Sequence, residues 1–154
     1  MTQAEEQERQ SVVQEALSWI GTPYHHAAGV KGCGVDCAYL LIEVYSRCGI
    51  VPRINPGPYK GNIATFVKGQ RLYRRIVSSL SRQVRRPPRP GDVAVFMVNI
   101  GGRHRNFLAT HGGIVIEWPR VVHALQGRGV LEEMVYEHHP LLRLDSFWSP
   151  HKWT

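Results

Sequence analysis

Hydrophobic side chains in the first half of the chain recur every three or four residues, the spacing that gathers them on one face of an α-helix. The first such segment begins near Ser11 and closes at Gly21, since Pro23 cannot continue a helix. Its apolar face consists of Val12, Val13, Ala16, Leu17 and Ile20. Residues 1–10 are mostly polar, and we expect them to form a flexible N-terminal lead-in.

Two more helices are predicted downstream. One covers residues 37–48 and is terminated by Gly49, with Leu40, Leu41, Val44 and Tyr45 facing inward. A connection rich in proline and glycine follows over residues 52–61. The next amphipathic segment carries many arginines and is expected to run to Pro87, with an apolar face made of Leu72, Tyr73, Ile76, Val77, Leu80 and Val84.

The pattern changes to a period of two after Gly91, which indicates strands. The first strand is apolar on both sides and should be buried on both faces: Val93, Val95 and Met97 alternate with Ala94, Phe96 and Val98. A polar loop over 99–110 precedes strands at 111–118, 120–125 and about 129–136. Helices first and strands afterward predict an α+β fold with an antiparallel sheet, and 154 residues fit a single domain over 11–154.

The net charge of +7 is concentrated in one segment, because seven arginines fall between Arg71 and Arg89. Such a cluster would attract nucleic acid, an anionic wall polymer or an acidic protein alike, since diffuse electrostatic attraction does not distinguish among polyanions. The alternative is the solvated face of an amphipathic helix.

Cys37 stands where an Asp-led turn gives way to an apolar helical run. A thiol at a helix N-terminus is favoured as the reactive thiolate, because backbone N–H groups and the helix dipole stabilise negative charge there. The chain has three cysteines, at positions 33, 37 and 48, and an uneven count argues against a disulfide framework. The alternative reading of Cys37 is a small buried hydrophobic residue.

Two histidines are the candidate bases. His111 opens an alternating run and His123 lies in the next one, separated by a short turn at Pro119 and Arg120. Neighbouring strands joined in this way would bring both imidazoles to the same end of a sheet. The alternative for each is a structural histidine of the core.

Four motifs in this order resemble the NlpC/P60 cell-wall peptidases over about residues 16–125. They are Gly34-Val35-Asp36-Cys37, Pro90-Gly91-Asp92-Val93-Ala94-Val95-Phe96, His111-Gly112-Gly113-Ile114-Val115-Ile116 and Val122-His123-Ala124, with Gly21-Thr22-Pro23-Tyr24 ahead of the nucleophile. The resemblance implies a papain-like fold whose nucleophile helix packs on the antiparallel sheet. It also implies that Cys37 is the nucleophile, His111 the base and His123 the residue that orients it.

The resemblance further implies that Tyr24 donates to the oxyanion and that Asp36 helps to hold a substrate ammonium. Tyr24 could equally pack beside Pro23, and Asp36 could simply cap the helix. The sequence departs from the family where Ala38-Tyr39 replaces the usual Ser-Gly, which removes a hydroxyl that commonly contacts the stem peptide. The details of the substrate are therefore left open.

The eight histidines of the chain make a structural zinc site an alternative. Cys33 and Cys37 are not followed by a second ligand pair at zinc-finger spacing, and the adjacent histidines at 25–26 and 138–139 usually point in different directions. We therefore expect no metal and no cofactor.

The function that this resemblance implies is a peptidoglycan endopeptidase, cutting most often between D-glutamate and the diamino acid. An amidase or acyltransferase on the same Cys-His platform is an alternative, and so is a non-enzymatic tail-assembly module with a basic surface. No secretory signal is apparent, and the segment Phe147–Trp153 resembles the versions found with phage tails and gene transfer agents. We therefore expect synthesis in the cytoplasm, action on the cell wall as a tail component, and partners in the tail tip or baseplate.

Overall fold

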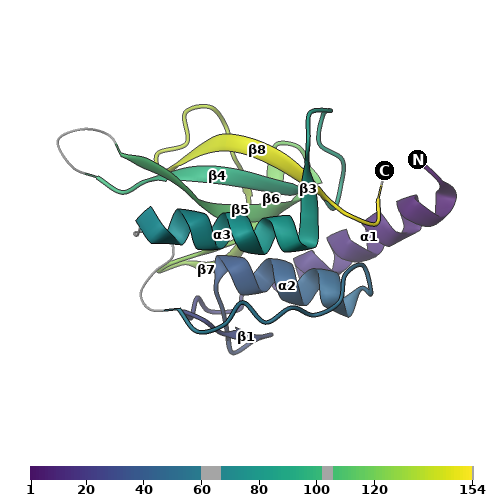
Figure 1. Cartoon of the computed structure of the whole chain (residues 1–154), viewed down its shortest axis with the longest axis horizontal. Helices are drawn as coiled ribbons and strands as arrows, with labels where there is room; N and C mark the ends of the chain where they lie inside the picture. The colour runs from purple at the N-terminus through teal and green to yellow at the C-terminus, as the bar shows by residue number, and fades with distance from the viewer. Residues whose placement is uncertain (60–66, 102–105, 154) are drawn as a thin grey trace.

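The computed structural model of the protein describes residues 1–59, 67–101 and 106–153, and these form helices and an antiparallel sheet (Figure 1). The helices are α1 Gln3–Ser18, α2 Cys37–Arg47 and α3 Val67–Leu80. The strands are β1 Gly29–Val30, β2 Gly34–Val35, β3 Ser81–Val84, β4 Val93–Asn99, β5 Phe107–Glu117, β6 Arg120–Leu125, β7 Gly129–Met134 and β8 Leu142–Pro150. The predicted α+β class is confirmed.

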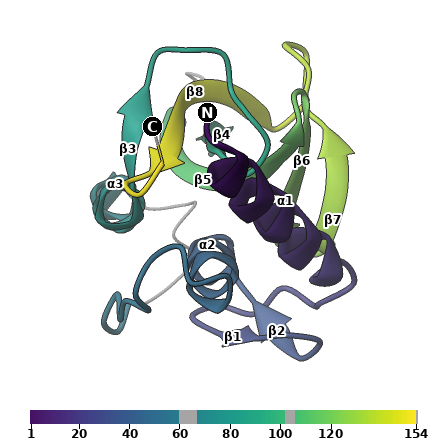
Figure 2. The same cartoon turned by 90° about the vertical axis from the view of Figure 1, so that its right-hand side faces the viewer.

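The main sheet has six strands in the order β3-β8-β4-β5-β6-β7, and every pairing is antiparallel. Helices α2 and α3 pack against β5, near the middle of the sheet. Figure 2 shows the sheet strongly curved, with α2 and the small β1–β2 hairpin on the same side of it.

Two apolar clusters lie on opposite faces of the sheet. The larger is formed by the helices and by side chains such as Val93, Val95 and Ile114, and the smaller includes Ala94 and Phe96 on the other face. Successive side chains of a strand point to opposite faces. The period-two pattern after Gly91 therefore describes β4 correctly, as a strand buried on both sides.

Helix α1 begins at Gln3, so the prediction that it starts near Ser11 was wrong. Thr2 caps the helix, accepting a hydrogen bond from the backbone N–H of Glu5 at 3.1 Å. Arg9 is only 2% exposed and donates to Glu5 and to Asp92, each at 2.9 Å. Residues 3–10, predicted as a flexible lead-in, are therefore fixed by a buried ion-pair network.

Helix α3 ends at Leu80, earlier than predicted, and the chain continues as strand β3. This strand pairs with β8 from Ser81↔Pro150 to Val84↔Phe147. The C-terminal segment that suggested a tail protein in the sequence supplies residues 147–150 to the end of β8, which lies between β3 and β4, and residues 151–153 follow the strand. Pairing between segments so far apart in the chain left no local signal, so both strands were missed.

Within the described residues, none of the helices combines the length and the apolar character needed to cross a membrane.

Candidate active site

Cys37 is the first residue of α2, directly after its N-cap. The Asp36 side chain accepts hydrogen bonds from the backbone N–H groups of Ala38 and Tyr39, which starts the helix at this point. The Cys37 Sγ lies 3.8 Å from the backbone oxygen of Thr110 on β5, within reach of a weak S–H donor. Helix α2, which carries the predicted nucleophile Cys37, is thus held against the strand that carries His111.

His111 follows an irregularity in β5. Phe96 of β4 pairs with His111 and Met97 pairs with Ala109, so Thr110 is an extra residue in the ladder. Such a bulge changes the direction of the side chain next to it. A side chain at Gly112 would collide with the Tyr73 hydroxyl, which lies under this part of the strand. The His-Gly pair therefore lets α3 approach the sheet directly beside the base.

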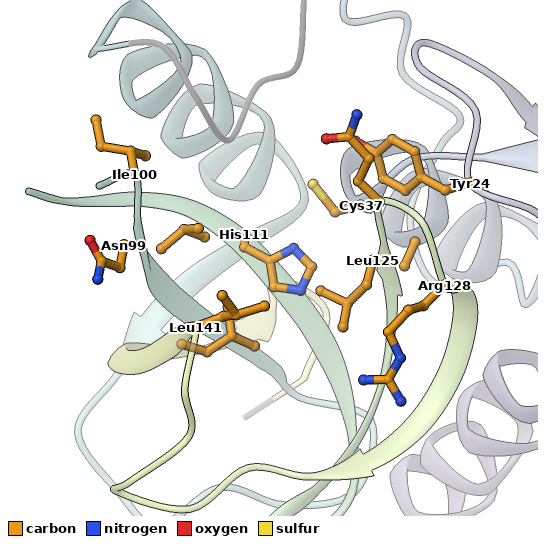
Figure 3. Close-up of a pocket in the computed structure, with 12 residues that line it drawn as sticks. Tyr24, Cys37, Asn99, Ile100, His111, Leu125, Arg128 and Leu141 are labelled. Carbon is orange, nitrogen blue, oxygen red and sulfur yellow. The ribbon is translucent and has the colours of Figure 1, made fainter. Parts of the chain in front are cut away.

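Cys37 and His111 line one pocket of about 310 Å³. Figure 3 shows the Cys37 sulfur and the His111 ring facing the same space, with Tyr24 beside Cys37. The remaining wall is largely apolar, and Arg128 lines its rim. The apolar lining residues are Val98, Ile100, Ala124, Leu125, Leu141 and Leu142. A small, mostly apolar pocket with a few polar groups is typical of a ligand site.

The imidazoles form a hydrogen-bonded chain that leads away from Cys37. The Nε2 atom of His111 lies 2.9 Å from Nδ1 of His123, and Nε2 of His123 lies 2.9 Å from a carboxylate oxygen of Glu133 on β7. His123 is completely buried and His111 is 4% exposed. The structure therefore brings together the three residues predicted to be catalytic and adds Glu133.

Burial favours the neutral forms of both reacting groups. It raises the pKa of the Cys37 thiol well above its usual value, and the Asp36 carboxylate adds to this, while the N–H groups of Cys37 and Ala38 lower it. Burial also lowers the pKa of His111 well below its usual range, helped by the nearby His123. A helix N-terminus alone was expected to favour the thiolate, but burial outweighs it. A neutral thiol and a neutral imidazole that line one pocket can act as proton donor and proton acceptor.

Tyr24 lies at the pocket close to the nucleophile. Burial and the charges of Cys37 and Asp36 raise the pKa of the Tyr24 hydroxyl above its usual value. The hydroxyl thus stays protonated and remains a hydrogen-bond donor. This placement fits the predicted contact with an oxyanion.

The acceptor positions of the Asp36 carboxylate are all filled by hydrogen-bond donors of the protein. One carboxylate oxygen accepts from the N–H groups of Ala38 and Tyr39, and the other accepts from Ala27 N at 2.9 Å and from the Tyr59 hydroxyl. A carboxylate offers about four acceptor positions, and all four are taken here. Asp36 is also only 1% exposed, so two capping bonds and two bonds from Ala27 and Tyr59 use its whole acceptor capacity inside the protein.

The Ala38 position, where the sequence departs from the family, is fully buried in the main core. Tyr39 is partly buried, and its ring lies 6.4 Å from that of Tyr59. A hydroxyl at residue 38 would therefore lie in apolar surroundings in this chain.

No group of three or more His, Cys, Asp or Glu side chains that could hold a metal occurs among the residues that the structure describes. All three cysteines are free.

The arginine cluster separates into two groups. Arg86 donates to the buried Asp92, and Arg82 donates to backbone oxygens of His151 and Trp153. These two residues bind the C-terminal segment and the turn before β4. Arg82 is itself exposed, as are Arg71, Arg74, Arg75 and Arg85. Any contact with a polyanion thus falls mainly on the exposed residues.

Comparison with protein-family models gives no match, and comparison with curated protein sequences gives none either. Solved structures do match. The NlpC/p60 domain of the peptidoglycan hydrolase SagA is 20% identical with a TM-score of 0.57, and the match covers 92% of this chain and 97% of that one.

NlpC1 and NlpC2 from Trichomonas vaginalis are each 15% identical, with TM-scores of 0.60 and 0.61. The match again covers 92% of this chain but only 45% and 47% of theirs, so this chain spans about half of their length. These likenesses show that the chain has the NlpC/P60 fold, as predicted.

The sequence did not reveal Glu133 as part of this site. The ladder pairs Val121 with Glu133, which places Glu133 on the same face as His123, two residues further along β6. The predicted strand near 129–136 was correct, but its register against β6 could not be read from its own pattern. A predicted strand pairing would have been needed to find this residue.

Proposed function

We propose that this chain is a cysteine peptidase that hydrolyses an amide bond in the peptide stems of bacterial peptidoglycan. The observation that carries the proposal is the pocket shared by Cys37 and His111, with His123 hydrogen-bonded behind His111. The NlpC/P60 fold and the description of SagA as a peptidoglycan hydrolase support the substrate class.

The proposed reaction begins when His111 takes the thiol proton as the Cys37 sulfur attacks the carbonyl carbon. Backbone N–H groups at the start of α2 and the Tyr24 hydroxyl stabilise the resulting oxyanion. The C–N bond then breaks, and the leaving amine receives the proton from His111. Water attacks the thioester carbon while His111 accepts a proton from that water. The C–S bond then breaks to release the carboxylic acid, and the thiolate takes back the proton from His111.

The apolar pocket favours this sequence of steps. Because burial disfavours a resting thiolate–imidazolium pair, charge develops mainly when a substrate is present.

The finer assignment is cleavage between D-glutamate and the diamino acid by an enzyme that a phage tail carries to the wall. It is supported by the sequence resemblance alone. Within this proposal, the exposed Arg71, Arg74 and Arg85 contact the anionic wall or an acidic tail component.

The test is mass spectrometry of muropeptides released from purified sacculi. A stem endopeptidase releases shortened stems with a new amino terminus on the diamino acid. An amidase would release whole stems from the glycan, and an acyltransferase would give products carrying the acceptor. Intact sacculi after long incubation would refute the proposal.

A further inference from the structure

We infer that Glu133 is a positioning residue of the candidate active site, which sets the protonated nitrogen of His123 and, through it, that of His111. Its effect on catalysis rests on the proposed function. The arrangement of protons does not, because it is a property of the folded chain.

The geometry around Glu133 is specific. One carboxylate oxygen lies 2.9 Å from Nε2 of His123. The other lies 3.2 Å from Nε2 of His139 and 3.6 Å from a guanidinium nitrogen of Arg128. The Glu133 side chain is 22% exposed, whereas His123 is fully buried. The hydrogen-bond chain from His111 through His123 therefore ends at a carboxylate that is partly exposed to solvent, whereas both histidines are buried.

The ionised carboxylate accepts hydrogen bonds but donates none. Although burial works against it, hydrogen bonds from His139 and His123 lower the pKa of Glu133, so it is ionised near neutral pH. The proton of neutral His123 must then reside on Nε2, where it is donated to Glu133. The Nδ1 atom of His123 is left as an acceptor.

This acceptor determines the state of His111. Since Nδ1 of His123 accepts at 2.9 Å, Nε2 of His111 must be the donor. The lone pair of neutral His111 is then on Nδ1, its only remaining ring nitrogen. A carboxylate on β7 thus leaves His111 with the one free nitrogen that a general base needs.

His139 shows why Glu133 is itself well fixed. The Nδ1 atom of His139 accepts hydrogen bonds from the backbone N–H groups of Leu141 and Leu142, both at 3.1 Å. Its proton is therefore on Nε2 and is donated to Glu133. Leu141, Leu142 and Arg128 all line the pocket. The Glu133 carboxylate is therefore linked to the pocket wall through His139 and Arg128, and to His111 through His123.

A simple surface ion pair is the alternative reading, and the neighbouring residue provides a matched control. Glu132 lies on the opposite face of β7 and pairs with Arg120 at 3.3 Å, where both side chains are about one-third exposed or more. Glu132→Gln changes the charge in the same way as Glu133→Gln but leaves the histidine chain intact.

The direct test is long-range ¹H–¹⁵N NMR of the histidine rings near pH 7.5 in the inactive Cys37→Ala background. We expect His123 and His111 to carry their protons on Nε2, and Glu132→Gln to leave both unchanged. Glu133→Ala should give mixed tautomers at His123, and so should Glu133→Gln, because its single amide oxygen cannot accept from both His123 and His139. An unchanged His123 spectrum in a folded Glu133→Ala protein would overturn the inference.

Kinetics give a second readout with Cys37 present. The alkylation rate of Cys37 by iodoacetamide and the kcat for stem peptides should both fall about 10- to 100-fold in Glu133→Ala, the range seen when the outer hydrogen-bond partner of a functional histidine is lost. Unchanged rates in Glu132→Gln, the matched charge control, support positioning. Equal rates in Glu133→Ala and the parent would contradict it.

Failure of the two proposals can be told apart. If the parent protein does not digest sacculi but the tautomers follow Glu133, the proposed substrate is wrong and the positioning role stands. If sacculi are digested and Glu133→Ala changes neither the tautomers nor the rates, the positioning role is wrong.

Discussion

The Nε2 atom of His111 lies 2.9 Å from Nδ1 of His123, on the neighbouring strand β6. Both rings are buried, and the pair lies beside the N-terminus of the helix that carries Cys37. Two histidines in this relation act as one unit, because the second fixes the ring orientation and the proton position of the first.

The first prediction concerns that unit. His111→Ala should lower kcat by about 10³-fold or more, comparable to loss of Cys37, since members of one catalytic unit are not additive. His123→Asn should retain more activity than His123→Ala, because the amide oxygen can still accept from His111. Steady-state assays on a stem tetrapeptide measure both. Equal activity of His123→Ala and wild type would remove His123 from the site.

The second prediction concerns stability and pH. Burial lowers the pKa of His123 from 6.5 to about 4 in the folded chain. Between these values the unfolded chain binds a proton that the folded chain does not, so the free energy of unfolding decreases as the pH falls. The loss should total about 3 kcal/mol for this residue, and His111 acts in the same direction.

Urea unfolding at pH 7.5, 6.0 and 5.0 measures this slope, and wild type is compared with His123→Asn. The free energy of unfolding should depend less steeply on pH in the variant. Above pH 7 these two histidines should contribute no pH dependence in either protein. An identical slope would mean that His123 titrates normally in the folded state.

The third prediction concerns the substrate terminus. Since Asp36 is buried and all its acceptor positions are filled, it should not hold a substrate ammonium. The kcat/KM values for a free tetrapeptide and its N-acetylated form should agree within about threefold. A hydrogen bond between ammonium and carboxylate, worth about 1.5–3 kcal/mol, would make them differ by about tenfold or more. A strong preference for the free amine would restore the sequence-based role of Asp36.

The fourth prediction separates the two groups of arginines. The triple variant Arg71→Gln, Arg74→Gln, Arg85→Gln should bind sacculi more weakly at low salt, with unchanged stability, because these side chains are exposed. Arg86→Gln should instead lower the free energy of unfolding by about 1–3 kcal/mol, because it removes hydrogen bonds to the buried Asp92.

Sedimentation with sacculi at two salt concentrations and urea unfolding provide the two measurements. If the triple variant binds sacculi as strongly as wild type at both salt concentrations, these arginines do not contact the wall.

Local periodicity was enough to predict the parts of the fold that are stabilised locally. Helix α2 follows from its cap and apolar face, and β4 from its alternation. The parts that were missed depend on distant partners. Arg9 fixes the start of α1 through Asp92, 83 residues away, and β3 exists only because β8 pairs with it.

The same distinction applies to the site. Cys37, His111 and Tyr24 were singled out by short motifs, and the structure places them in one pocket. Glu133 and His139 carry no such motif, because their positions depend on the register of β7 and on the turn after it. The sequence also did not show that every acceptor position of Asp36 is filled, because one of the donors is Tyr59 in the proline-rich connection.

The most direct test of the account compares the three cysteines. Purified sacculi are incubated with wild type and with Cys37→Ala, Cys33→Ala and Cys48→Ala, and released muropeptides are quantified by mass spectrometry. Cys33 is exposed and Cys48 partly buried, and neither lines the pocket, so their variants should digest at the wild-type rate. Cys37→Ala should release about 10³-fold less or nothing. Substantial release of shortened stems by folded Cys37→Ala would contradict the central claim that Cys37 is the nucleophile.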